Sequence, residues 1–349
     1  MRLEPRAHAP FWLNLTAPIA AIGLAFAFCA LLILWSGAPI IDSYAALLRG
    51  AFGSTFALTE TLTRAAPLIF TGLAAAVAFR AKLWNIGGEG QLYAGALAAT
   101  WVGTGMVHLP PFLMVPFLFL VGAVAGGLLL LLPVILKLKL RVDEVVTTLL
   151  LNFVVILFAN YLLFGPWKDP LAMGWPQAAP IIDEGILGTL VPRMRLHSGL
   201  IWAVAFAVFA WAFIRFTRWG FQIRAVGYNP EAAAFAGMPI GATVLRTALL
   251  SGGLAGMAGV CELAGAKGYL TIDISPGFGY TGIAVAMLAG LHPLGVVAAA
   301  IFVAAIYNGA DAMSRAMSIS NYLADVLTAT ALLLVLASVL FVRFRPQWR

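Results

Sequence analysis

The chain carries very little charge. Only 10% of its 349 residues are charged, whereas 62% are hydrophobic, and the mean hydropathy is +0.97. A soluble domain normally has about 25% charged residues, so this composition excludes a water-soluble surface. We therefore expect an all-α polytopic integral membrane protein that forms a single transmembrane domain over residues 1–349.

Cysteine and histidine are scarce as well. Cys29 and Cys261 both fall in apolar runs, so we interpret them as small buried residues and not as a disulfide. No metal site is predicted, because His108 has no Cys, His or carboxylate near it at ligand spacing. We find no Ser/His, HExxH or paired-carboxylate pattern, so no catalytic residues are expected. No GxxxxGK[ST] loop is present either, so the chain should bind no nucleotide cofactor itself.

Apolar runs divide most of the chain. Nine of them are long enough to cross a hydrocarbon core of ~30 Å, and a shorter run spans Gly279–Leu291. They predict about ten transmembrane helices, some of them discontinuous where Gly and Pro interrupt residues 267–295. The second to fifth crossings resemble the seventh to tenth in order, which suggests a weak internal repeat. The nine long runs begin near Leu15, Leu58, Gly87, Phe112, Val145, Leu200, Arg246, Gly295 and Tyr322.

Basic residues predict the orientation. In this topology fourteen of them fall on one side and six on the other, and the richer side should be cytoplasmic. Both termini, a tail over residues 1–12 and a loop over residues 217–245 would then face the cytoplasm, and residues 165–197 would form a periplasmic loop. Because this bias and lipid headgroups account for the net charge of +7, no nucleic-acid partner is expected.

The loop over 217–245 contains signals for a short helix. Asn229 is a good N-cap, Pro230 suits the first helical position and Glu231 complements the helix dipole. Ala232, Ala233 and Ala234 would extend the helix, and Gly237 would end it. A helix of two turns is marginal alone, so we expect it to dock on something; a plain surface turn is the alternative.

A second polar stretch, Asn85–Gln91, opens the third apolar run. Its glycines and polar residues predict unwound backbone or a sharp helix start at membrane depth, which is tolerated only within protein or beside a water-filled cavity. Asn85, Glu89 and Gln91 would either contact a substrate or satisfy the unwound backbone. Glu262 and Asn308 are further candidates for a cavity lining, with helix packing as the alternative.

Small residues recur along the seventh apolar run. Ser251, Gly252, Gly256 and Gly259 stand at helical spacing, which predicts close contact with a neighbouring helix in lipid.

Two of these stretches resemble a known family. Glu231-Ala232-Ala233 followed by Gly237 is similar to the first half of the EAA loop of bacterial ABC-importer permeases. Trp84-Asn85-Ile86-Gly87-Gly88-Glu89-Gly90-Gln91 closely resembles a segment of the simple-sugar and nucleoside branch, with Trp84 at a Phe position. The distal half of the long-form EAA loop is missing, since Thr247-Ala248-Leu249-Leu250 stands there. The chain thus looks most like a nucleoside permease of this branch.

The resemblance implies a permease subunit that imports a nucleoside or simple sugar across the bacterial inner membrane by alternating access. Residues 229–234 and Gly237 would couple it to a cytoplasmic ABC ATPase, which would carry ATP and Mg. The implied partners also include a second permease subunit, commonly a different chain, and a periplasmic or lipoprotein substrate-binding protein. The alternative is a gradient-driven transporter or channel for a small polar solute, with Glu89 and Glu262 as the coupling groups.

Overall fold

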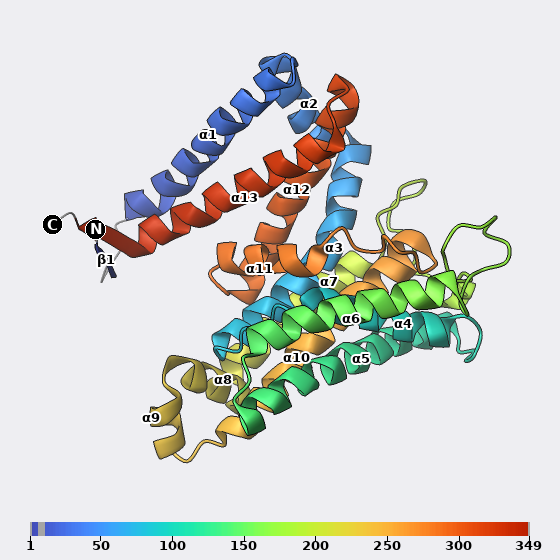
Figure 1. Ribbon diagram of the computed structural model, residues 1–349, viewed down its shortest axis with the longest axis vertical. Coiled ribbons are helices and arrows are strands. Elements are labelled where there is room, and N and C mark those ends of the chain that lie inside the picture. Colours follow the sequence, from blue (N-terminus) through green and yellow to red (C-terminus); the bar gives the residue numbers. More distant parts are fainter. Residues whose placement is uncertain (1, 6–10, 348–349) are drawn as a thin grey trace. The chain divides into compact units, whose positions relative to one another are not determined.

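The computed structural model describes residues 2–5 and 11–347 (Figure 1). The chain divides into two compact units, one of residues 1–61 and 301–349 and one of residues 62–300. The boundaries fall within two helices, α3 (Thr55–Arg80) and α12 (Pro293–Met317). Half of the predicted cytoplasmic tail, Met1 and residues 6–10, lies outside the described residues.

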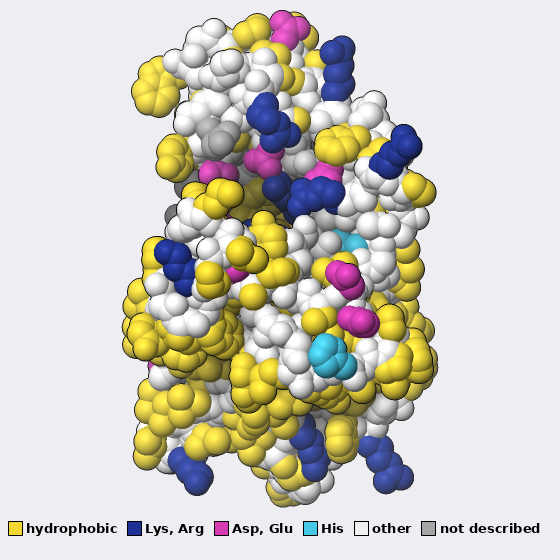
Figure 2. All heavy atoms as spheres, turned by 90° about the vertical axis from the view of Figure 1, so that its right-hand side faces the viewer, with side chains coloured by type: hydrophobic (Ala, Val, Ile, Leu, Met, Phe, Trp, Pro, Cys, Tyr) yellow, Lys and Arg dark blue, Asp and Glu magenta, His cyan; other side chains and the backbone are white. Residues whose placement is uncertain are grey.

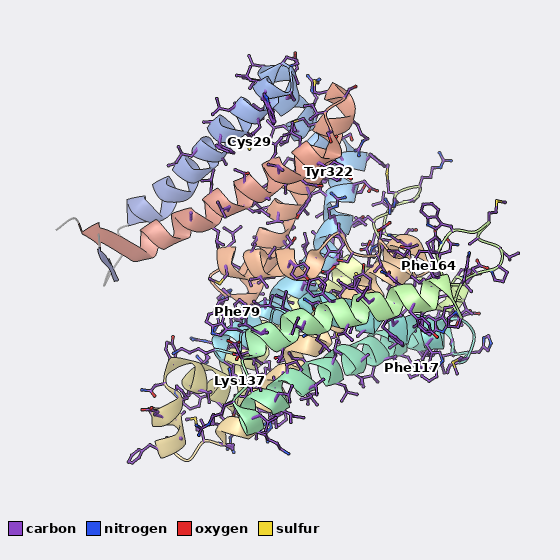
Figure 3. All side chains as sticks on the ribbon, in the orientation of Figure 1. Cys29, Phe79, Phe117, Lys137, Phe164 and Tyr322 are labelled. Carbon is purple, nitrogen blue, oxygen red and sulfur yellow. The ribbon has the colours of Figure 1, made fainter. Side chains whose placement is uncertain are left out.

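The first unit is built from α1 (Phe11–Trp35), α2 (Ile40–Phe52), α13 (Asn321–Arg343) and the adjoining parts of α3 and α12. Helices α1 and α13 lie side by side (Figure 1), and the strands next to them, β1 (Arg2–Pro5) and β2 (Phe344–Gln347), pair antiparallel. Cys29 of α1, labelled in Figure 3, is a buried free thiol that packs with Met313 and Leu327. This confirms the sequence-based interpretation of the cysteine as a small buried residue.

The second unit contains the remaining helices. In chain order they are α4 (Gly88–Gly103), α5 (Pro111–Leu140), α6 (Glu144–Phe164), η1 (Asp183–Gly185), α7 (Gly199–Phe216), α8 (Arg218–Tyr228), α9 (Pro230–Phe235), α10 (Ile240–Cys261), η2 (Glu262–Lys267) and α11 (Phe278–Leu288).

Helix α10 is central to this unit and packs against both α5 and α4. Within its apolar window 72% of the residues are buried, against 28% for α6 and for α7. The close approach depends on glycine, because a Cβ added at Gly256 would overlap the carbonyl oxygen of Gly122. A Cβ at Gly259 would likewise overlap the carbonyl oxygen of Leu92. The predicted small-residue contact is therefore confirmed.

The helices agree with the predicted apolar runs, but the predicted count of about ten crossings is not confirmed. Among the described residues six helices are long and apolar enough to cross a membrane, or seven if α1 and α2, which meet at a bend of 118°, form one span. Helix α4 has 16 residues and α11 has 11, so each is shorter than a full crossing. Hydropathy overstated the helical length of α4, whereas the short helix α11 agrees with the short run predicted over Gly279–Leu291.

The outer helices carry apolar side chains on their exposed sides, as expected of surfaces that face lipid. Helix α6 exposes Phe153 and Leu157 by 55% and 66%, and Phe164, labelled in Figure 3, lies in its last turn. On the face drawn in Figure 2, hydrophobic side chains form broad areas while charged side chains gather in separate groups. The chain is therefore a multi-pass membrane protein.

Residues 165–197 have little regular structure but are fastened to the segment that follows α10. Ala178 N–H donates to the carbonyl of Leu270 at 2.9 Å, and Leu187 N–H donates to the carbonyl of Ala264 at 2.9 Å. Isolated bridges pair Gln177 with Thr271 and Thr189 with His197. The long loop is consequently part of the folded unit.

Candidate functional site

Helix α9 begins as the sequence predicts. The Asn229 side chain accepts a hydrogen bond from Ala232 N–H at 3.0 Å, and Pro230 takes the first helical position. The helix ends at Phe235, and Gly237 follows with φ +78°, a left-handed value that glycine adopts without strain. The N–H groups of Gly237 and Met238 donate to the carbonyls of Ala234 and Ala233, which closes the final turn.

One residue of α9 is buried. Ala233 is 4% exposed and belongs to a hydrophobic cluster with Phe79 of α3, Val134 of α5 and Val244 of α10. Phe235, by contrast, is 96% exposed. Helix α9 is thus held to the unit by one side and leaves its other residues exposed, including Glu231, Ala232 and Ala234.

Helix α8, which precedes α9, was not predicted. It was included in the loop over 217–245, whereas Arg218–Tyr228 form a continuous helix capped by the Thr217 hydroxyl, which accepts from Gly220 N–H at 3.0 Å. Helix α8 touches the end of α3, because a Cβ added at Gly227 would overlap the carbonyl oxygen of Arg80. The Thr217-Arg218 pair and the alternation of Arg with aromatic residues were the available signals.

The polar stretch predicted over Asn85–Gln91 is unwound only in its first part: a non-helical break over residues 81–87 follows α3, and α4 then starts sharply at Gly88. Asn85 and Gln91 form a reciprocal amide pair, in which each side-chain nitrogen donates to the other side-chain oxygen at 2.9 Å. Asn85 Nδ2 also donates to Ser251 Oγ at 3.1 Å, and Ser251 Oγ donates to the carbonyl of Ala74 at 2.8 Å. The two amides therefore link the break to α3 and α10, and both are buried.

Asn152 of α6 binds backbone groups on both sides of the point where the break ends and α4 begins. Its Oδ1 accepts from Gly90 N–H at 2.7 Å, and its Nδ2 donates to the carbonyl of Ile86 at 3.0 Å and to the Tyr280 hydroxyl at 3.2 Å. Asn152 is fully buried. Asn152 was not among the predicted site residues, although an amide inside an apolar run is itself a signal of a functional or bridging group.

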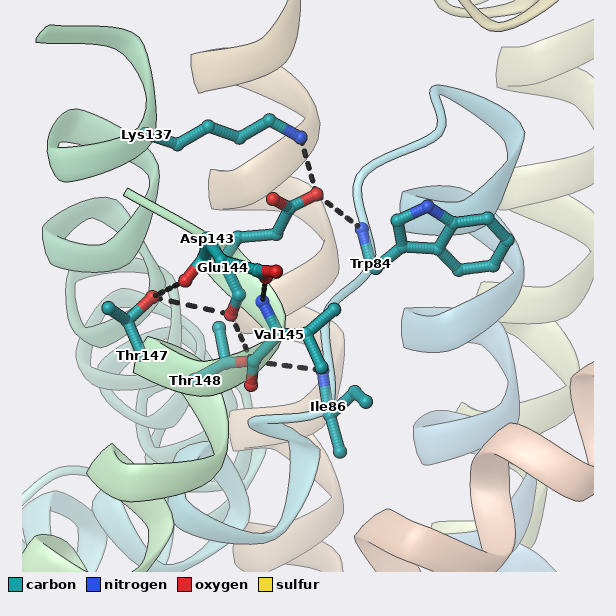
Figure 4. Close-up of polar contacts among 8 residues, drawn as sticks. All are labelled: Trp84, Ile86, Lys137, Asp143, Glu144, Val145, Thr147 and Thr148. Atoms are coloured by element: carbon teal, nitrogen blue, oxygen red, sulfur yellow. Dashed lines mark hydrogen bonds and ion pairs between the residues drawn. The ribbon is translucent and has the colours of Figure 1, made fainter. Parts of the chain in front are cut away.

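Glu144 fixes the start of the break from the first turn of α6 (Figure 4). Its carboxylate accepts from Trp84 N–H at 3.3 Å and forms an ion pair with Lys137 of α5. The neighbouring Asp143 caps α6 by accepting from Val145 N–H at 2.7 Å. Glu144 therefore holds α5, α6 and the break together.

Glu89 lies at the start of α4 and faces the start of α11. Its Oε2 accepts from Gly279 N–H at 2.6 Å, and the side chain is 3% exposed. Ser275, whose hydroxyl accepts from Gly277 N–H at 3.2 Å, lies next to the same carboxylate. Asn85, Glu89 and Gln91 thus satisfy unwound backbone and helix ends in this conformation, and a contact with substrate stays a prediction.

Glu262 and Asn308 have other surroundings. Glu262 begins η2, next to the positive charges of Lys267, Arg195 and Arg64. Asn308 belongs to the other unit, where its Nδ2 donates to the carbonyl of Gly50 at 3.1 Å, the carbonyl of Ala57 at 3.2 Å and Thr61 Oγ1 at 3.1 Å. In this structure Asn308 joins three helices of its unit.

His197 lies just before α7 and is 1% exposed. Its Nδ1 accepts from Gly199 N–H at 3.2 Å, which leaves the proton of the neutral ring on Nε2. Burial, and to a lesser extent the positive charge of Arg195, lowers the pKa of His197 to about 4. The ring is therefore neutral at physiological pH.

Comparison with known proteins agrees with this architecture. The family model described as "Branched-chain amino acid transport system / permease component" matches residues 57–336. A glucose ABC transporter permease protein of Haloferax volcanii is 35% identical over 99% of this chain and 93% of its own length. A guanosine ABC transporter permease protein of Bacillus subtilis is 36% identical over 93% and 94%. The solved structure of PsaBC from Streptococcus pneumoniae in complex with Fab superposes with a TM-score of 0.50 at 13% identity, covering 84% of this chain and 95% of that chain.

Proposed function

The chain belongs to the family of branched-chain amino acid transport system permease components, and from this membership we propose that it is the transmembrane subunit of an ATP-driven ABC importer. Its substrate would be a nucleoside or a simple sugar. Although the family description speaks of amino acids, the relatives at 35% and 36% identity are named for glucose and guanosine. The Asn85–Gln91 segment, with its resemblance to the sugar and nucleoside branch, favours the same substrate class.

The observation that carries the proposal is helix α9. A six-residue helix would not persist alone in water, yet here it is capped at both ends and anchored by Ala233, while Glu231 and Phe235 remain exposed. Such a surface fits a cleft in a second protein. We infer that residues 229–234 and Gly237 form the coupling helix that docks on a cytoplasmic ATPase.

The remaining assignments follow from this role. ATP and Mg would be bound by the ATPase and not by this chain. Both termini and α9 would face the cytoplasm of a bacterial cell, with the chain in the inner membrane. A second permease subunit, commonly a different chain in this branch, would complete the pathway, and a periplasmic or lipoprotein binding protein would deliver the substrate. Closure of the ATPases would then move α9 and switch the side to which the pathway opens.

The test is a mild-detergent purification of the tagged chain from its own host. Glu231→Arg reverses a charge on the exposed face of α9, and Glu184→Arg makes the same change on η1, distant from α9 in sequence and exposed. We expect an ATP-binding subunit to co-purify with the wild type and with Glu184→Arg, but to be lost from Glu231→Arg. If no ATPase accompanies the wild type, the importer assignment is wrong; if both variants retain it, α9 is not the coupling helix.

A further inference from the structure

Two cavities adjoin each other around α8. One, of about 450 Å³, lies between α7, α8 and α10 and is lined mainly by Phe209, Phe213, Trp219, Leu249 and Leu250. The other, of about 470 Å³, opens beside it and is lined by residues of the α7–α8 corner and by Met238. Gln222 of α8 lines both cavities, so the two form neighbouring parts of one groove.

The second cavity is strongly basic. Arg215, Arg218 and Arg224 line it, and Arg246 lies at the first cavity with its guanidinium 4.7 Å from the centre of the Trp219 ring. Among the described residues that line the two cavities, none is acidic. Three arginines gathered without a carboxylate repel one another, so this arrangement favours an anionic ligand.

Two buried polar atoms in the groove also lack a partner. Gln222 Oε1 and Arg224 Nε are inaccessible to solvent and make no hydrogen bond within the described structure. Arg224 moreover lies close enough to Arg80 for the two positive charges to repel. Only Arg224 Nε is a donor; a buried donor without an acceptor is costly, and an anion with several oxygens would satisfy it. Gln222 Oε1 is an acceptor and gains nothing from an anion.

The first cavity is the opposite in character. Its lining is almost wholly apolar, and the side chains of Trp219 and Leu249 are half exposed, so the cavity is open along the outer surface of the unit. At this point the chain leaves a membrane-spanning helix, α7, for an amphipathic helix, α8, which carries Trp219 and Phe221 among arginines. Such a helix lies at the boundary between headgroups and acyl chains.

We propose that this groove is a binding site for one anionic phospholipid. The phosphate would lie among Arg215, Arg218 and Arg224, and an acyl chain would fill the apolar cavity between Phe213 and Leu249. In the orientation given under the proposed function, the lipid comes from the cytoplasmic leaflet, where anionic headgroups face basic segments. Binding itself does not depend on transport activity.

The position of the site gives the lipid a route to α9. Met238, which lines the basic cavity, donates its N–H to the carbonyl of Ala233 and so closes the last turn of α9. A bound phosphate among the arginines of α8 would hold this loop in place. The lipid would thereby order the helix that we assign to coupling.

The experiment is native mass spectrometry of the purified chain titrated with palmitoyl-oleoyl phosphatidylglycerol or with the phosphatidylcholine of the same acyl chains. We expect selective retention of phosphatidylglycerol. Arg218→Gln should weaken its apparent affinity about fivefold, the effect of one basic charge near an anionic surface. Lys139→Gln removes a charge from the exposed end of α5, outside both cavities, and should change the affinity less than about twofold.

A second arm uses glycerophosphoglycerol, which has the headgroup without acyl chains. It should not displace the bound lipid at equal concentration, because the apolar cavity contributes to affinity. Equal retention of the two phospholipids, or equal effects of Arg218→Gln and Lys139→Gln, would show that only general charge attracts lipid. Displacement by glycerophosphoglycerol would show an anion site without a place for the acyl chain. Each of these results overturns the proposal, and none bears on the ATPase co-purification.

Discussion

Replacing Gly256 by alanine tests the packing of α10 against α5. An added Cβ would overlap the carbonyl oxygen of Gly122, lie 2.9 Å from its carbonyl carbon and lie 3.2 Å from the Cα of Gly126. Real Cβ atoms essentially never approach other heavy atoms closer than 3.0 Å. The obstructing atoms are all backbone atoms of α5, so no side chain can rotate away, and α10 must move away from α5.

The cost can be bounded. Overpacking of this kind costs about 1–3 kcal/mol, and here the rigid backbone places it toward the upper end. Alanine recovers about 1 kcal/mol of helix propensity relative to glycine. The net loss is therefore about 2 kcal/mol, which corresponds to a fall in melting temperature of about 5 °C for a unit of this size.

The same helix supplies a matched control. Gly241 also lies in α10, but an added Cβ there would have no heavy atom within 4 Å. Gly241→Ala should therefore leave the melting temperature unchanged or raise it slightly. A thiol-reactive dye can follow the unfolding in detergent, because Cys29 and Cys261 are both buried and free. If Gly256→Ala melts at or above the temperature of Gly241→Ala, the close contact of α10 with α5 is not as described.

Three further outcomes are expected. Burial and the charge of Arg195 lower the pKa of His197 to about 4 in the folded state, so the unfolded chain binds the proton more tightly. The free energy of unfolding should therefore fall by about 2 kcal/mol between about pH 7.5 and about pH 5. In melting curves recorded over this pH range, His197→Leu should reduce this dependence on pH. Asn152→Ala leaves Gly90 N–H without its acceptor and should destabilise the protein by about 1–3 kcal/mol, visible as faster hydrogen exchange at the start of α4. Asn308→Ala removes three hydrogen bonds from the first unit, so Cys29 should become accessible to a thiol reagent faster than in the wild type, and an unchanged labelling rate would contradict the bracing role of the amide.

Local features of the fold were predictable because they depend on neighbouring residues. The cap at Asn229, the first turn at Pro230 and the left-handed Gly237 follow from backbone chemistry that acts over a few residues. Hydropathy located the helices for the same reason, since burial in lipid is a property of a continuous run. The unwound backbone between Trp84 and Gly87 was indicated by the glycines at its end, Gly87, Gly88 and Gly90.

The partners of those features were not predictable. Asn152 is 62 residues from Gly90, and nothing in either segment indicates the other. The same holds for Glu144 and Trp84, and for the pairing of Gln177 with Thr271. The two candidate roles of Asn85 were left open for this reason, because satisfying unwound backbone depends on groups that only the folded chain brings close.

The burial of Ala233 has a mechanical consequence. Alanine has no side-chain torsion, so its methyl group cannot absorb a displacement by changing rotamer. The cluster around it includes the ends of α3, α5 and α10 through Phe79, Val134 and Val244. A displacement of α9 is therefore transmitted to three long helices at once through a short contact that cannot deform. A longer side chain at position 233 could change rotamer and would make the same contact flexible.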